Sequence, residues 1–325
     1  MKRFGPLFRI LLNLLGPAIL VYFLVTTDLQ ALWATLRQTN PWWFGLSCVL
    51  VVPFMLLKGW RWALILRAWH MPLPLLEASA LYSIGIFLGI VTPGQAGDAV
   101  KAWYLRKHGY SLRAGLASVV VDRLFDLGIM GVLAASGLYF FRDVLPGGIV
   151  LNVVVIAGVL GVVGLGLALA GSRRLRALIF GRVLPRILPE SLRERLLGNS
   201  GLHLLPGQLI WIGVVSCFGL GLTFLRTYLL FIAVGSYPPF GPFVALTAII
   251  AIVGTFSPGG IGTRDLALIL GLAAILNQST QDVRPLALTV STLLLALSVL
   301  NVLCGFLLSL RYPVSEATAK QVTES

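Results

Sequence analysis

Six long apolar segments constrain this chain more than any other feature of its sequence. They cover about residues 7–26, 41–66, 112–141, 147–170, 207–234 and 285–310. A helix needs roughly 20 apolar residues to cross the hydrocarbon core of a bilayer, and each segment meets that length. Because 58% of the residues are hydrophobic and only 11% are charged, the composition excludes both a soluble domain and a disordered chain. We therefore predict an all-α polytopic membrane protein with about six spanning helices.

Two further apolar runs, Ala78–Val91 and Phe243–Phe256, are too short to span a bilayer. Each run ends at a Pro-Gly break, at Pro93-Gly94 and at Pro258-Gly259, and a second helical pattern follows each break. These second helices are expected at residues 99–108 and 264–276. A helix, a break and a returning half-helix are typical of a re-entrant hairpin. We predict two such hairpins.

The basic residues predict the orientation of the chain. The net charge is +13, and most Lys and Arg residues gather at alternate ends of the predicted spans, which is the positive-inside pattern of membrane proteins. The five basic stretches are Lys2–Arg9, Lys58–Arg67, Lys101–Arg113, Arg173–Arg195 and Arg311–Lys320. This distribution favours contact with anionic lipid heads over nucleic acid. We expect a protein of the plasma (inner) membrane with both termini and the loop 171–206 in the cytoplasm.

A shift of 165 positions superposes the two halves of the sequence without a gap. Pro41 falls on Pro206, Arg61 on Arg226, Pro93 on Pro258, Gly94 on Gly259 and Gly97 on Gly262. We interpret this match as an inverted internal repeat, a plan that secondary transporters use, although chance similarity is an alternative. Residues 1–312 would then form one integral membrane domain, with repeat 1 at about 7–141 and repeat 2 at about 147–310. Residues 313–325 would form a polar C-terminal tail.

No catalytic or metal-binding pattern stands out. The three Cys residues lie singly in apolar runs, and the three His residues are scattered without HExxH, P-loop or nucleophile-elbow spacing. These residues are Cys48, Cys217, Cys304, His70, His108 and His203. We therefore expect no enzyme activity, no metal and no cofactor.

The hairpin tips are candidate anion sites. A chain that breaks at Pro and Gly leaves backbone amides unpaired, and the new helix N-terminus carries partial positive charge. Asp98 and Thr263 stand where N-cap residues belong. The candidate residues of the two tips are Pro93, Gly94, Gly97, Asp98, Pro258, Gly259, Gly260 and Gly262. The alternative is that both tips are only capped kinks.

The third apolar segment contains Asp122, Arg123 and Asp126. Residues four apart share a helix face, so the two carboxylates should line up, while Arg123 and Asp126 are spaced to pair. Charges at this depth are costly and must face protein or a wet cavity. A structural ion pair and a role in binding a head group or carrying protons both remain open.

Three further arginines complete the candidate set, together with Lys101. For Arg61 we expect snorkelling to the membrane interface within an aromatic belt of Trp60, Trp62 and Trp69. Arg226 lacks basic neighbours in the sequence, which favours a specific anion or carboxylate partner. Arg264 and Asp265 begin a half-helix as an expected local pair, with Arg264 facing a head group.

At these residues the chain resembles the flippase-like membrane domain of lysylphosphatidylglycerol synthases, the multiple peptide resistance factors, and its stand-alone relatives. Three motifs in order carry the resemblance: Thr92 to Asp98 with Lys101, Asp122-Arg123-Leu124-Phe125-Asp126, and Ser257 to Gly262 with Arg264 and Asp265. The resemblance implies a plasma-membrane protein connected with moving a lipid between leaflets. The synthases carry an aminoacyltransferase domain after the membrane part, and this chain ends shortly after Arg311, so lipid aminoacylation is not implied.

These observations predict a lipid translocase or transporter for an anionic or modified lipid. One alternative is a non-catalytic accessory protein that presents a lipid to a separate synthase or glycosyltransferase of a glycolipid or hopanoid pathway. Another is a small-solute transporter that uses Asp122 and Asp126 as proton carriers. The expected partners are membrane lipids, with no nucleic acid, and the oligomeric state is left open.

Overall fold

The computed structural model describes residues 29–90, 92–141, 148–172, 204–254 and 262–312. Within these ranges the chain forms helices and no strand, as the composition predicts. The predicted first span at 7–26, most of the loop 171–206, the tip Pro258-Gly259-Gly260 and the C-terminal tail lie outside the described residues.

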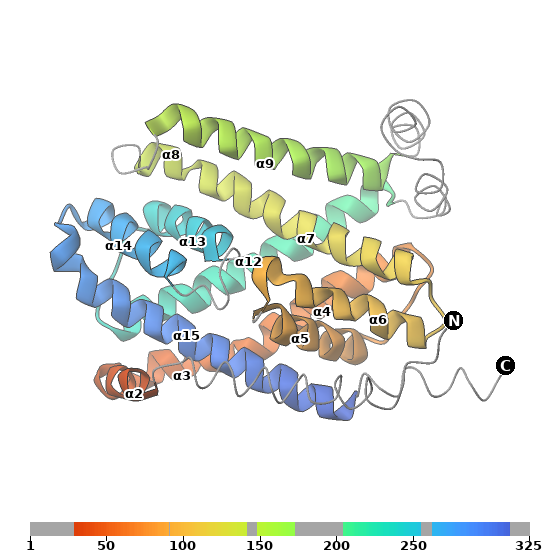
Figure 1. The fold of residues 1–325 in the computed structure, drawn as a ribbon, viewed down its shortest axis with the longest axis horizontal. Coiled ribbons are helices and arrows are strands. Elements are labelled where there is room, and N and C mark those ends of the chain that lie inside the picture. The colour runs from red at the N-terminus through yellow and green to blue at the C-terminus, as the bar shows by residue number, and fades with distance from the viewer. Residues whose placement is uncertain (1–28, 91, 142–147, 173–203, 255–261, 313–325) are drawn as a thin grey trace.

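The helices form one elongated bundle (Figure 1). In chain order they are α2 (Leu29–Gln38), α3 (Pro41–Val49), α4 (Val51–Ala68), α5 (Leu75–Ile90), the 3₁₀ helix η1 (Pro93–Ala99), α6 (Val100–Lys107), α7 (Leu112–Ala135), α8 (Gly137–Phe140), α9 (Gly148–Gly171), α12 (Pro206–Ala233), α13 (Phe240–Gly254), α14 (Thr263–Leu276) and α15 (Thr280–Arg311). Helices therefore occupy all of the predicted apolar segments that the structure describes.

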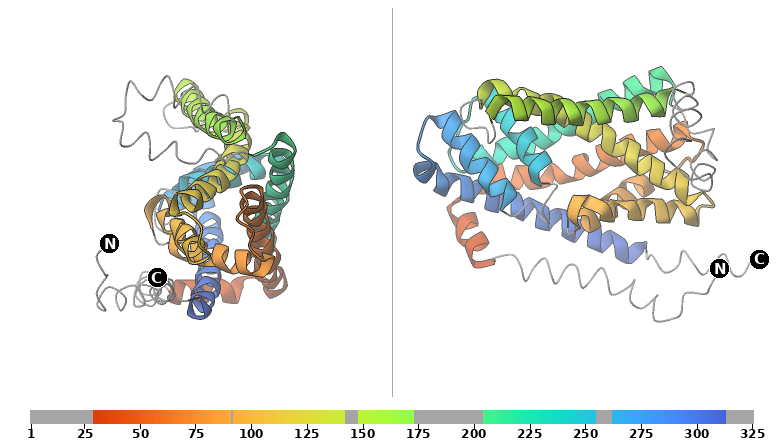
Figure 2. Two further views of the ribbon diagram at one scale, coloured as in Figure 1. Left: turned by 90° about the vertical axis from the view of Figure 1, so that its right-hand side faces the viewer. Right: turned by 45° about the horizontal axis from the view of Figure 1, so that its top comes forward.

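Three stretches of the described chain are long and apolar enough to cross a bilayer. They are Pro41–Ala68, which joins α3 and α4, then Pro206–Ala233 and Thr280–Arg311. Helix α7 has 24 residues, but the charges of its Asp122-Arg123-Asp126 group interrupt its apolar surface. Helix α9 also has 24 residues and runs beside α7 at the edge of the bundle (Figures 1 and 2). Spans beyond the three therefore stay a prediction.

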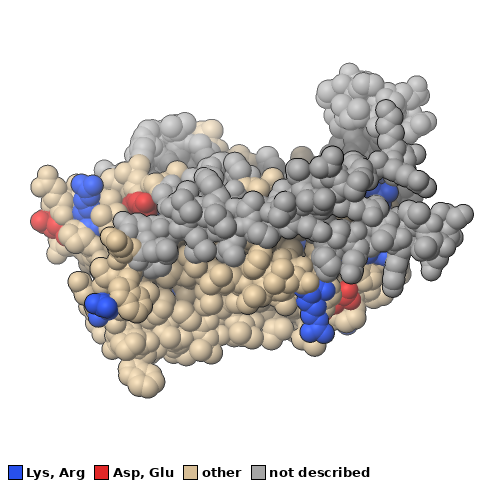
Figure 3. Space-filling model, turned by 60° about the horizontal axis from the view of Figure 1, so that its bottom comes forward, with Lys and Arg blue, Asp and Glu red and all other residues tan. Residues whose placement is uncertain are grey.

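The surface of the bundle is apolar between charged ends. Figure 3 shows Lys, Arg, Asp and Glu side chains near the two ends of the visible face, with uncharged surface between them. Basic residues end α4, α6 and α15 and begin α7, and Figure 1 shows these termini at the same end of the bundle. These residues are Arg67, Arg106, Lys107, Arg113 and Arg311. An apolar band bounded by charge suits a protein surrounded by lipid.

Both predicted half-helices are present. Helix α6 covers Val100–Lys107 and α14 covers Thr263–Leu276, within a residue of the predicted ranges 99–108 and 264–276. Each packs beside the helix that precedes it, α5 or α13, and Figure 1 shows the two pairs extending toward opposite ends of the bundle. This arrangement is compatible with an inverted repeat, which itself stays a prediction.

The predicted N-caps of the half-helices are wrong. Asp98 lies inside η1, and α6 begins after Ala99 without a side-chain cap, because the chain leaves the break through a 3₁₀ turn. Thr263 is the first residue of α14, and the capping residue is Gly262, at φ +81°. The Asp265 carboxylate accepts a hydrogen bond of 3.0 Å from the Gly262 amide. Asp265 therefore does the capping that was expected of Thr263.

Glycine allows α5 to pack closely against two long helices. A Cβ on Gly59 of α4 would overlap the backbone of Ser79, and a Cβ on Gly305 of α15 would overlap the carbonyl oxygen of Ser83. Small residues at helix contacts are typical of membrane bundles, where close packing replaces the hydrophobic effect as the main attraction between helices. The close contacts hold α5, and with it the first hairpin, between α4 and α15.

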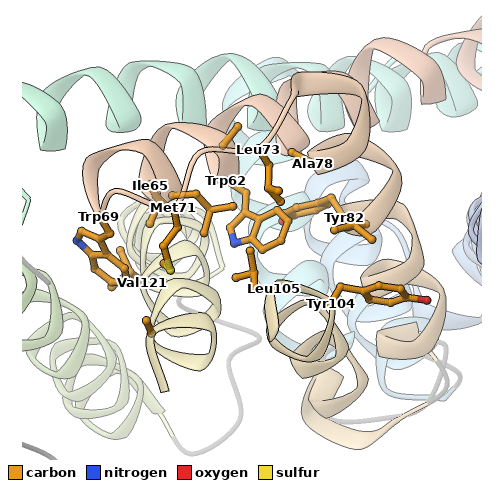
Figure 4. Close-up of a cluster of buried hydrophobic side chains, with 14 of the residues drawn as sticks. Trp62, Ile65, Trp69, Met71, Leu73, Ala78, Tyr82, Tyr104, Leu105 and Val121 are labelled. Carbon is orange, nitrogen blue, oxygen red and sulfur yellow. The ribbon is translucent and has the colours of Figure 1, made fainter. Parts of the chain in front are cut away.

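Aromatic side chains fill the core beside α6 rather than forming a belt around Arg61. Trp62 is fully buried and Trp69 is 6% exposed, whereas Trp60 is 37% exposed. Figure 4 shows Trp62 beside Tyr82 and Leu105. The Trp62 indole N–H donates to Ser118 Oγ at 3.1 Å, so its polar atom is satisfied inside the protein. The predicted aromatic belt is therefore wrong for two of its three members.

Candidate functional site: a buried ion network beside a polar cavity

Arg61 of α4 is the centre of a buried ion network. Its Nε donates to Asp122 Oδ1 at 2.8 Å, and its Nη2 donates to Asp126 Oδ2 at 3.0 Å. The Arg61 side chain is 1% exposed. The prediction that it reaches the membrane interface is wrong, because the planar guanidinium group is held between two carboxylates of α7.

Asp122 and Asp126 do share a helix face, as their spacing predicts, because both contact the same guanidinium group. Asp122 is fully buried and accepts a further hydrogen bond from the Tyr82 hydroxyl at 3.0 Å. Asp126 is 16% exposed and lies 2.6 Å from the Nζ of Lys58, which is one turn before Arg61 on α4. The inner carboxylate is thus enclosed by protein, and the outer one reaches the edge of the network.

Arg123 points in another direction. Its Nη2 lies 2.8 Å from Asp98 Oδ2, and its Nη1 donates to the side-chain oxygen of Gln95. The predicted pairing of Arg123 with Asp126 is wrong, because successive residues of a helix point about 100° apart and Arg123 faces η1 while its neighbours face α4. Arg123 therefore ties the broken segment of the first hairpin to α7.

Lys101 of α6 joins the two parts of the network. Its Nζ lies 2.9 Å from Asp98 Oδ2 and 3.6 Å from Asp122 Oδ2. The same ammonium group sits 3.9 Å from the centre of the Tyr82 ring. The Lys101 side chain is fully buried, and its charge is stabilised by these carboxylates, by the Tyr82 ring and by the Trp62 ring, whose centre lies 5.3 Å from Nζ.

The network as a whole joins four helical segments of the first half of the chain. Its members are Lys58, Arg61, Asp98, Lys101, Asp122, Arg123 and Asp126. Sequence reasoning found six of them but treated Lys58 only as part of a basic stretch, and it did not find Tyr82 or Gln95. The spacing of Lys58 and Arg61, one helical turn apart on the same face, is the signal that could have indicated Lys58.

A cavity lies directly beside this network. Its volume is about 260 Å³, and the network residues Lys58, Arg123 and Asp126 line it together with Arg226 of α12. A second cavity of about 280 Å³ lies next to it and is lined by Arg264 of α14. The two cavities share Ile90, Gln95, Thr223, Thr227, Leu294 and Ser298. They therefore form one polar and apolar space between the two hairpins.

The ends of both hairpins border this space. Gly89, Ile90, Thr92 and Gln95 come from the first hairpin, and Gly254 and Arg264 come from the second. Gln95 has a left-handed backbone at φ +55°, which is uncommon for a residue other than glycine. The predicted free amides of the first tip are partly used within it, since the Gly97 amide donates to Thr92 Oγ1 at 2.8 Å. The hydrogen-bond donors at this cavity thus come from side chains more than from free backbone amides of the first hairpin tip.

Arg226 is the most isolated charge at the cavity. It is 5% exposed, its Nε donates to the Ser47 carbonyl oxygen at 3.3 Å, and its Cζ lies 5.0 Å from the centre of the Phe54 ring. No carboxylate of the described chain lies within ion-pair distance of it. The expected carboxylate partner is therefore not found there, and a ligand anion remains as the alternative.

Arg264 and Asp265 do not pair directly. Arg264 Nε and Nη2 donate to the hydroxyl and carbonyl oxygens of Ser291, both at 3.2 Å, and the Ser291 hydroxyl donates in turn to Asp265. The expected local pair is thus bridged by a serine of α15. Arg264 lines the larger cavity, which adjoins the one lined by Arg226 and Lys58.

The remaining predicted site residues are placed less directly. Pro93 and Gly94 begin η1, and Gly97 packs so closely on α5 that a Cβ would overlap the Leu88 carbonyl group. Pro258, Gly259 and Gly260 lie outside the described residues. Among the described residues no cluster of His, Cys, Asp and Glu could hold a metal ion.

The fold and the site define a class of protein: a helical membrane protein with a charged, partly apolar cavity between two broken helices. The sequence belongs to the family described as the lysylphosphatidylglycerol synthase TM region, which it matches over residues 10–281. This confirms the family that the three motifs indicate.

Two relatives come from Methanothermobacter thermautotrophicus, and both are named UPF0104 membrane protein. One is 24% identical over 267 residues, which cover 74% of this chain and 76% of the relative. The other is 27% identical over 249 residues, which cover 70% of this chain and 72% of the relative. The family and these names support a membrane protein, and they say nothing of what it carries.

Proposed function

We propose that this protein moves an anionic or modified lipid between the leaflets of the plasma membrane. The observation that carries this proposal is Arg226, which has no carboxylate partner among the described residues and lines a cavity between the two hairpins together with Lys58 and Arg123. A buried arginine without a carboxylate is costly, and an anionic head group would compensate its charge. We further propose that the protein acts as a binder and carrier, not as an enzyme, and that it needs no cofactor.

The lining of the cavity suits an amphiphile. Its cations are accompanied by apolar lining residues, namely Phe54, Ile86, Ile90, Leu294 and Leu297. A head group would bind the cations while its acyl chains stay in hydrocarbon. If the inverted repeat holds, the two hairpins would open the site to opposite leaflets in turn. The ion network would keep α4, α7 and the first hairpin together during this movement.

The accessory role remains a second candidate. A protein that presents a lipid to a separate synthase or glycosyltransferase would need the same charged cavity, and it would bind the lipid without moving it. Reconstitution separates the two roles. We expect proteoliposomes that contain only this protein to move a fluorescent anionic phospholipid across the bilayer faster than a neutral analogue with the same acyl chains.

The controls for this assay are protein-free vesicles and the neutral analogue. Retention of the anionic lipid by the purified protein without transbilayer movement would favour the accessory role. Equal movement of both lipids would remove the cationic cavity from the mechanism, and movement of neither with no lipid retained would contradict the proposal.

The orientation has its own test. With Cys48, Cys217 and Cys304 replaced by Ser, we expect Tyr237→Cys, between α12 and α13, to react with an impermeant maleimide on intact cells. Arg113→Cys, at the start of α7, should react only after permeabilisation. Both positions are exposed, so access to the reagent decides the result. The reverse pattern would contradict cytoplasmic termini.

A further inference from the structure

The smaller cavity contains more positive than negative charge. Among the described residues that line it, Lys58, Arg123 and Arg226 are cationic, and only Asp126 is anionic. The excess is two charges, and it stays two when the whole ion network is counted with Arg226, since five cations then face the three carboxylates of Asp98, Asp122 and Asp126. A buried excess of this size is unfavourable unless counter-ions occupy the space, because few of these charges are exposed to solvent.

Two of these cations lie beside the same aromatic ring, that of Phe54. The Nζ of Lys58 lies 5.8 Å from the centre of the Phe54 ring, and the Cζ of Arg226 lies 5.0 Å from the same ring. Lys58 has one carboxylate partner, Asp126, and Arg226 has none among the described residues. Both cations also line the smaller cavity, so an anion inside it would compensate both charges.

The donors of this pair are largely available. Arg226 uses its Nε on the Ser47 carbonyl oxygen, and no hydrogen bond from its Nη1 or Nη2 to the described residues is present. Lys58 has three N–H donors and uses one on Asp126. The guanidinium fork and the ammonium group therefore both have N–H donors left for an anion in the cavity that they line.

The carboxylate at the edge of the network can give up Lys58 without losing its other partner. Asp126 also accepts from Arg61 at 3.0 Å, and Arg61 is held in addition by Asp122 at 2.8 Å. A ligand oxygen that takes over Lys58 therefore leaves Asp126 still paired. Asp126 is thus the partner of Lys58 that an oxygen of the ligand can replace.

From these observations we propose that the smaller cavity binds a terminal phosphate with two negative charges, a phosphate monoester, in preference to a phosphodiester. A phosphate monoester carries up to two charges near neutral pH and three terminal oxygens, which match the charge excess and the two donor groups. A phosphodiester has a single charge and would leave one cation uncompensated. This inference rests on the proposed function and specifies the head group.

The test compares two lipids that differ by one methyl group. The full-length protein, in nanodiscs of phosphatidylcholine, is titrated with fluorescent phosphatidic acid and with phosphatidylmethanol of the same acyl chains, at about pH 7.5, where a phosphate monoester carries most of its second charge. We expect phosphatidic acid to bind about tenfold more tightly. Inorganic phosphate, added as a competitor, distinguishes a soluble phosphate from a lipid head group.

Variants assign the preference to the cavity. Arg226→Gln should bring the ratio of the two affinities close to one, and Arg226→Lys should retain part of it. Arg37→Gln, on the exposed surface of α2, should leave the ratio unchanged. Thermal unfolding of each variant shows that it is folded, and Arg226→Lys keeps the test usable if Arg226→Gln is not.

Each outcome decides between the two proposals. Equal binding of both lipids, or tighter binding of phosphatidylmethanol, would overturn the inference while leaving an anionic-lipid translocase in place. Binding of inorganic phosphate without either lipid would support the doubly charged ligand and contradict the lipid function. Binding of none of the three would contradict both.

Discussion

Arg61→Met should destabilise the protein more than the loss of any other charge in the ion network. It removes one cation from two carboxylates, and Asp122 is fully buried. Loss of one partner from a buried ion pair costs about 3 to 5 kcal/mol, because the remaining charge is left in the protein interior without a counter-charge or solvating water. The measurement is thermal unfolding of the purified protein in detergent, and we expect a clear fall in Tm. Arg67→Met, on the same helix but exposed, is the matched control.

A double variant separates the charge effect from simple loss of packing. In Arg61→Met with Asp122→Asn, the carboxylate that loses its arginine partner is neutralised as well, and we expect part of the lost stability to return, because a buried ion pair can often be replaced by neutral groups at little cost. A Tm for Arg61→Met close to that of Arg67→Met would contradict the central role of Arg61. A double variant no more stable than Arg61→Met would show that shape, rather than charge, is responsible.

Arg226→Gln should abolish most transport while leaving the fold intact. Arg226 has no carboxylate partner within the described chain, so its removal strands no acid. A neutral glutamine in the same space cannot compensate an anionic head group, and we expect transbilayer movement of anionic lipid to fall by about tenfold or more, the loss that follows from one charge-assisted hydrogen-bonded contact.

The transport rate of Arg226→Lys should lie between those of the wild type and Arg226→Gln, because lysine keeps the charge and loses the planar fork. Flippase activity in proteoliposomes is the readout, with Tm measured on the same preparations and Arg37→Gln as the control for a general loss of charge. Transport at the wild-type rate in Arg226→Gln would mean that the cavity is not on the lipid path. A loss of Tm as large as that of Arg61→Met would assign Arg226 a structural role.

The helical elements follow from local pattern, which explains their predictability. A run of apolar residues must form a helix where backbone groups find no water, and Pro and Gly interrupt it. The half-helices at Val100–Lys107 and Thr263–Leu276 were therefore predictable to within a residue. The capping of α14 was not predictable from the sequence. Thr263 could cap the helix, or Gly262 could do so with Asp265, and the backbone conformation at Gly262 decides between these alternatives.

The sequence predicted which residues form the candidate site better than it predicted which of them bind each other. Residue type and depth were enough to single out Asp122, Arg123 and Asp126, because charges inside apolar segments are costly and rare. Asp98 and Lys101 were singled out by their place after the Pro-Gly break and by the family motif. Arg61 was misassigned because the same local sequence suits an arginine that reaches the membrane interface and one that is buried in the protein. The choice between them depends on whether a carboxylate of another helix lies within reach.

Hydropathy and the Pro-Gly breaks are sufficient to predict an all-helical membrane protein and the places where its helices break. These properties depend on hydropathy and chain geometry along a single segment. Tertiary structure is needed to show that Arg61 binds Asp122 and Asp126, that Arg123 binds Asp98, and that Lys58 and Arg226 lie beside one ring at a cavity. Arg123 and Asp98 are 25 positions apart in the chain, and Arg61 and Asp126 are 65 apart. The strength of an ion pair depends on the distance and burial of its two groups, and here separate helices bring those groups together.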